Sequence, residues 1–100
     1  MKAIYSPEAL AELREGIAWY NQQSEGLGAD FHDEILKTVS EICSDPNRFA
    51  MYEGAVLEQP VQRALAKRFP YVITFKAVGD AIRILSVFHG HRLPGYWENS

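Results

Sequence analysis

The chain has 100 residues, of which 47% are hydrophobic and 12% are aromatic, with a formal net charge of −3 at pH 7. This composition predicts one globular domain over residues 1–100 and excludes a disordered chain. No apolar run approaches the ~20 residues of a membrane-spanning helix, and the N-terminus lacks the apolar core of a signal peptide. Cys43 is the single cysteine, so an internal disulfide is excluded and we expect a cytoplasmic protein.

The first half of the chain predicts a short strand and two helices. Residues 2–5 favour a strand, and Ser6-Pro7 is typical of a helix start, because serine can accept a hydrogen bond from a free backbone N–H. Apolar side chains with helical spacing predict two helices around the short breaker 21–28, which makes an antiparallel helical hairpin. The first helix has Leu10, Leu13, Ile17 and Tyr20 in its stripe, with Trp19 beside them and Glu8, Glu12 and Glu15 facing away. The second has Phe31, Ile35, Val39 and Ile42, and it ends at Ser44-Asp45-Pro46.

The last forty residues predict three strands. The first spans residues 61–69 and ends at Pro70, and the second alternates over residues 71–76. Gly79-Asp80 is a two-residue hairpin turn with glycine first. Residues 81–88 are apolar on both faces apart from Arg83 and Ser86, which indicates a central strand. The predicted fold is therefore α+β, with an N-terminal helical hairpin packed on one face of a small antiparallel β-sheet in the order β-α-α-β-β-β.

Charge is distributed unevenly along the chain. Residues 1–60 carry four Lys or Arg against eleven Asp or Glu, whereas residues 61–100 carry six against two. A basic C-terminal part suggests an anionic partner, but the two halves can equally complement each other within one fold.

The residues that could bind a ligand or act in catalysis are also concentrated in the basic C-terminal part. Basic and titratable side chains gather on the predicted sheet, where they could bind phosphate and move a proton; the alternative is a solvated strand face that protects an edge from aggregation. His89 and His91 supply only two of the ligands that zinc needs, and the other candidates, His32 and Cys43, lie on the second helix. Cys43 sits in an apolar band, which is typical of an inert thiol. We therefore predict no metal and no cofactor.

Several segments resemble a known family. The stretch A-L-A-K-R-F-P-Y-V-I-T-F, followed by G-D and I-R-I-L-S-V-F-H-G-H-R-L-P-G-Y-W, is similar to the RelE/ParE superfamily of type II toxin–antitoxin toxins. The upstream G-L-G-A-D-F and D-P-N-R-F-A segments are similar to the same family. The resemblance implies a compact toxin that is neutralised by the C-terminal segment of a cognate antitoxin, seated in a groove or added as a strand.

Two branches of the superfamily imply different targets. RelE-like members cleave mRNA on the ribosome, whereas ParE-like members inhibit DNA gyrase by binding it. The F-P-Y-V-I-T-F strand, the net negative charge and the ending with His89, Arg92 and Trp97 favour the ParE branch. The sequence departs from the family pattern at Val72, where arginine is frequent, and at Leu93, where aspartate is frequent. A third alternative is an interaction module without toxicity.

The resemblance assigns roles to named residues. We expect the target, gyrase or alternatively the ribosome and mRNA, to contact Arg63, Lys67, Arg68, His89, His91, Arg92, Tyr96 and Trp97. If the protein is a ribonuclease, its catalytic residues are expected among Arg63, Lys67, Arg68, His89 and Arg92. The antitoxin, which would be a ParD-like or other small DNA-binding protein forming a hetero-oligomer, is expected to contact Leu10, Leu13, Trp19, Tyr20, Tyr71 and Phe75.

Overall fold

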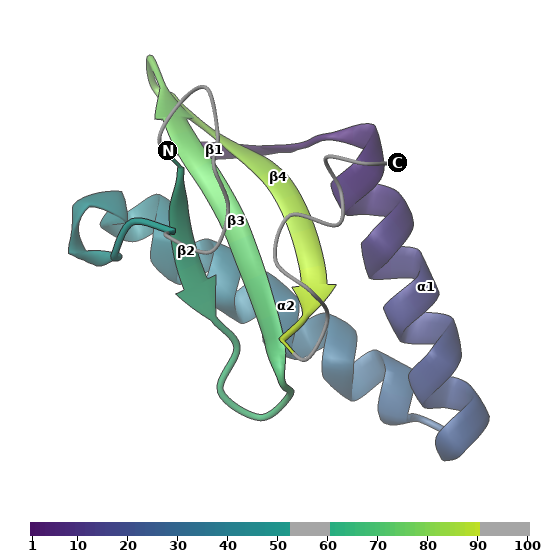
Figure 1. Ribbon diagram of the computed structural model, residues 1–100. Helices are drawn as coiled ribbons and strands as arrows, with labels where there is room; N and C mark the ends of the chain where they lie inside the picture. Colours follow the sequence, from purple (N-terminus) through teal and green to yellow (C-terminus); the bar gives the residue numbers. More distant parts are fainter. Residues whose placement is uncertain (53–60, 91–100) are drawn as a thin grey trace.

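The computed structural model describes residues 1–52 and 61–90 and confirms the predicted order of elements (Figure 1). Strand β1 is followed by two long helices, a short 3-10 turn and three further strands. Their bounds are β1 Lys2–Tyr5, α1 Pro7–Gln23, α2 Leu27–Ser44, η1 Pro46–Arg48, β2 Gln62–Leu65, β3 Tyr71–Val78 and β4 Ala81–His89.

Ser6 starts α1 and also ties it to the sheet. Its hydroxyl accepts a hydrogen bond from the N–H of Ala9 at 3.0 Å, as the sequence predicts for an N-cap. The same hydroxyl donates to the carbonyl of Leu85 on β4, also at 3.0 Å. One side chain therefore fixes where the helix begins and where it lies along the last strand.

The two helices form a hairpin that is closed by small residues. Only Ser24–Gly26 separate them, and Gly26 has a φ of 83°, which glycine adopts without strain. A Cβ on Gly28 would lie 2.4 Å from the carbonyl oxygen of Ile17, so the helices meet at backbone contact there. Asn21 Oδ1 accepts the N–H of Gly28 at 2.8 Å and takes the place of a side-chain cap for α2.

The sheet has four strands in the order β1-β4-β3-β2, with β4 in the interior as predicted. The pairs β2–β3 and β3–β4 are antiparallel, but β1 pairs with β4 in parallel, from Lys2 opposite Ala81 to Tyr5 opposite Ile84. The sheet is therefore mixed. Hairpin turns dictate antiparallel pairing only for strands that they join, and β1 reaches β4 through both helices.

Two local features set which side chains face the helices. Gly79, with a φ of 62°, opens the predicted β3–β4 turn. In β4, Ser86 pairs with Thr74 while Ile84 pairs with Phe75, so Leu85 is an extra residue, a β-bulge. The bulge reverses the alternation along the rest of β4.

Strand β2 is shorter than the predicted strand 61–69. It ends at Leu65, and the N–H of Ala66 donates to the carbonyl of Tyr71 across the start of a turn. Lys67 and Arg68 therefore lie in the connection before β3 instead of on a strand face.

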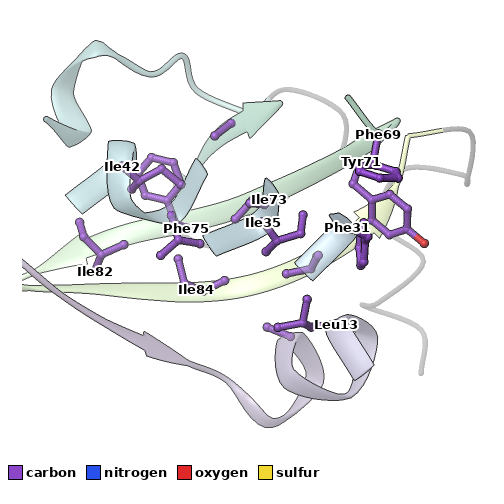
Figure 2. Close-up of a cluster of buried hydrophobic side chains, with 14 of the residues drawn as sticks. Leu13, Phe31, Ile35, Ile42, Phe69, Tyr71, Ile73, Phe75, Ile82 and Ile84 are labelled. Atoms are coloured by element: carbon purple, nitrogen blue, oxygen red, sulfur yellow. The ribbon is translucent and has the colours of Figure 1, made fainter. Parts of the chain in front are cut away.

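The core lies between the helices and one face of the sheet, which we call the helix face (Figure 2). Phe31, Phe69 and Tyr71 cluster at one end, and Ile42, Phe75 and Ile82 fill the other. Phe31 and Tyr71 lie 4.6 Å apart between ring centroids, within the range of favourable aromatic pairs. α1 contributes Leu13 from the side of β4.

Candidate functional site

The described residues of the predicted target surface do not lie on one face of the sheet. Arg63 pairs with Thr74, and His89 pairs with Tyr71. Because Tyr71 and Thr74 are three residues apart on one strand, they point to opposite faces. Tyr71 packs in the core, so His89 lies on the helix face and Arg63 on the opposite face.

The two basic residues in the β2–β3 connection lie against α2. The buried Glu34 carboxylate accepts the backbone N–H of Lys67 at 2.9 Å, and Lys67 Nζ lies 3.4 Å from Glu41. Arg68 lines a small hollow with the acidic residues Asp30, Asp33 and Glu34. These contacts are those of an acidic helix and a basic turn that complement each other within one fold.

The residues predicted to contact the antitoxin lie in two environments. Leu13, Tyr20, Tyr71 and Phe75 are buried in the core, although Tyr71 also lines a hollow between α1 and β4. Leu13 and Tyr20 belong to the regular apolar stripe of α1, and such a stripe is the part of an amphipathic helix that packs on its own sheet. Leu10 and Trp19 are exposed, at 37% and 54% of their surface.

The predicted site residues His91, Arg92, Tyr96 and Trp97 lie outside the described residues. Among residues 1–52 and 61–90, no group of three or more His, Cys, Asp or Glu is placed to hold a metal ion. None of the helices in this part of the chain is long and apolar enough to span a membrane.

A hollow lies between α1 and the end of β4, and we call it the α1–β4 pocket. It encloses about 420 Å³. Its helical wall repeats at positions i, i+3, i+4 and i+7, which lie on one side of a helix. These residues are Glu12, Glu15, Gly16 and Trp19.

The opposite wall comes from the sheet. His89 and Val87 reach the pocket because the bulge at Leu85 turns them to the helix face. The rings of Tyr71 and His89 meet edge to face at 5.4 Å. Glu12 spans the gap, and its Oε1 accepts the N–H of Val87 at 2.9 Å.

The helical spacing of α1 predicts Glu12 and Glu15 on the solvent side, but both line the pocket. The pattern that could have identified them is the second helical stripe formed with Gly16 and Trp19. Gly16 is essential to the shape, because a Cβ there would lie 2.6 Å from the ring of Phe31 and 3.4 Å from the hydroxyl of Tyr71. The pocket thus combines two carboxylates, aromatic rings and a bare backbone position.

Two buried tyrosines have raised pKa values. Burial raises the pKa of Tyr5 above its ordinary value of 10.0, and the nearby Cys43 raises it further. The Tyr5 hydroxyl is buried and has no hydrogen-bond partner among residues 1–52 and 61–90. Burial likewise raises the pKa of Tyr20. Both groups stay neutral at physiological pH and serve packing.

Comparison with known proteins supports the resemblance found in the sequence. The family described as "ParE toxin of type II toxin-antitoxin system, parDE" matches residues 3–94. A solved structure titled "Chromosomal ParDE TA system from P. aeruginosa" has a TM-score of 0.74 with this fold, covers 89% of this chain and 95% of that chain, and is 19% identical. No curated protein sequence is a match for the chain.

Proposed function

The chain belongs to the ParE toxin family of type II toxin–antitoxin systems, and we propose that it arrests growth by binding and inhibiting DNA gyrase. We further propose that a cognate antitoxin forms a hetero-oligomer with it and holds it inactive. Because gyrase and the antitoxin would both be met in the cytoplasm, we propose that the protein acts there. The family match over residues 3–94 is the observation that carries the proposal.

The arrangement of the described cations supports binding over catalysis. General acid–base cleavage of RNA needs the phosphate ligands and the proton-transfer group around one scissile bond. Arg63 and His89 face opposite sides of the sheet, and the ammonium group of Lys67 lies 3.4 Å from the Glu41 carboxylate of α2. These residues therefore do not form one compact centre around a phosphate, which disfavours the RelE-like ribonuclease.

The acidic surface of the helices also disfavours the ribonuclease. α1 and α2 together expose carboxylates such as Glu15, Asp30 and Asp33, and acidic surfaces are repelled by the phosphate-dense ribosome. A protein target tolerates such a surface. We propose that gyrase contacts Arg63, Lys67, Arg68 and His89, on more than one face of the sheet, and also His91, Arg92, Tyr96 and Trp97.

The test is a gyrase supercoiling assay with purified protein. We expect loss of supercoiling at micromolar concentration, and recovery when the charge of the contact is removed by Lys67→Gln and Arg68→Gln together. Arg14→Gln, at an exposed position of α1, is the matched control for a lost surface cation. Full supercoiling with folded wild-type protein would contradict the proposal. Cuts in mRNA on induction that disappear with His89→Ala would support the ribonuclease instead.

A further inference from the structure

The α1–β4 pocket has a composition that suits one class of ligand. Glu12 and Glu15 bring two carboxylates to its helical wall. None of the described residues that line it is a lysine or an arginine; His89 is the single titratable base among them. An anion would meet repulsion here, and an apolar side chain would bury the Glu15 carboxylate without compensating its charge. A cationic ligand would not be repelled by the carboxylates and would compensate their charge.

The aromatic side chains of the pocket favour a guanidinium over other cations. Trp19 exposes 54% of its surface at the mouth of the pocket and is held edge-on against Tyr20, with 4.9 Å between ring centroids. Tyr71 and His89 form the opposite side. A planar guanidinium can stack on an indole while its N–H groups reach a carboxylate, which a compact ammonium does less well.

We propose that the α1–β4 pocket receives an arginine side chain from the neutralising antitoxin, stacked on Trp19 and paired with Glu15. The identity of the partner rests on the proposed function; the recognition of a guanidinium rests on the pocket alone. Glu12 already accepts the N–H of Val87, so it holds the strand in place while its charge adds to the attraction. The surplus of carboxylates on the two helices favours an antitoxin segment that is basic where it crosses α1.

The experiment is a nuclear magnetic resonance titration of the folded protein with N-acetyl-L-arginine amide. N-acetyl-L-citrulline amide, a neutral molecule of nearly the same shape, is the matched probe. We expect millimolar binding of the arginine probe, with shifts concentrated at the amides of Gly16 and Val87 and at the indole N–H of Trp19. The citrulline probe should shift them little.

Two exposed positions test the geometry without threatening the fold. Glu15→Gln and Trp19→Ala should each weaken binding by about two- to five-fold, the range of single exposed charge and cation–π contacts. Glu25→Gln, in the loop between the helices, removes the same charge outside the pocket and should leave the affinity unchanged.

Equal binding of both probes, or shifts spread evenly over the acidic surface, would overturn the proposal. Binding that appears only in an Arg92→Gln variant would also overturn it, because the occupant would then be the chain's own arginine two residues after Gly90. If the probe fails to bind while gyrase is inhibited, the pocket assignment alone is wrong. If the arginine probe binds but the protein does not inhibit gyrase, the recognition of a guanidinium is supported and the gyrase proposal is wrong.

Discussion

Replacing Gly28 with alanine tests the closest approach in the helical hairpin. The added Cβ would lie 2.4 Å from the carbonyl oxygen of Ile17 and 2.5 Å from the side chain of Asn21. The carbonyl belongs to the backbone of α1, so relief requires the helices to move apart. That movement would also stretch the 2.8 Å hydrogen bond between Asn21 and the N–H of Gly28.

Three terms decide the size of the effect. Overpacking costs about 1–3 kcal/mol, and the weakened hydrogen bond adds about 1 kcal/mol. Alanine recovers at most about 1 kcal/mol through its helix propensity. The net loss in the free energy of unfolding is therefore about 2 kcal/mol, which lowers Tm by about 8–16 °C in a chain of this size.

Thermal and urea unfolding followed by circular dichroism measure this loss. Ala29→Gly is the control, since it changes propensity at the next, exposed position of α2 and should cost no more than about 1 kcal/mol. A Gly28→Ala variant as stable as wild type would show that the helices do not meet at backbone contact, and the hairpin described above would then be wrong.

Three further substitutions have defined outcomes. Ser6→Ala should cost about 1–2 kcal/mol in urea unfolding, because it removes the N-cap of α1 and the donor to β4. Glu34→Ala should cost about 1–3 kcal/mol by stranding the N–H of Lys67, and Glu34→Gln, which keeps an acceptor, should recover most of it; equal losses would contradict the hydrogen bond. Tyr5→Phe removes a buried hydroxyl that has no partner in the described part of the chain, and it should stabilise the fold by up to about 1 kcal/mol. The folded state holds the Tyr5 proton more tightly than the unfolded chain, so its raised pKa gives stability that is intact below pH 10.0 and lost above it. Tyr5→Phe should flatten that alkaline loss in denaturation measured against pH.

Local patterns were enough to predict much of the fold. The Ser6 cap, the apolar stripes and the Gly79-Asp80 turn each act within a few residues, and the structure has all of them. Parallel pairing of β1 with β4 joins residues about eighty positions apart, and no local pattern specifies it. The strand predicted to continue past Leu65 ends there because a turn forms before Pro70.

The site was harder to predict than the fold. Strict alternation would place His89 on the same face as Arg83 and opposite Ile84, away from the helices. The single extra residue Leu85 reverses that arrangement and brings His89 beside α1. The pocket also depends on Gly16, whose role is set by the distance to Phe31 on another helix. Such distances are properties of the packed molecule.

The pairing of β1 with β4 also has a consequence for biosynthesis. Tyr5 finds its strand partner only at Ile84, so the sheet closes only after Ile84 has been translated. Contacts of such long sequence separation form late and slow folding, because the loop between them must be ordered first. A growing chain therefore exposes an unpaired first strand until β4 has been synthesised.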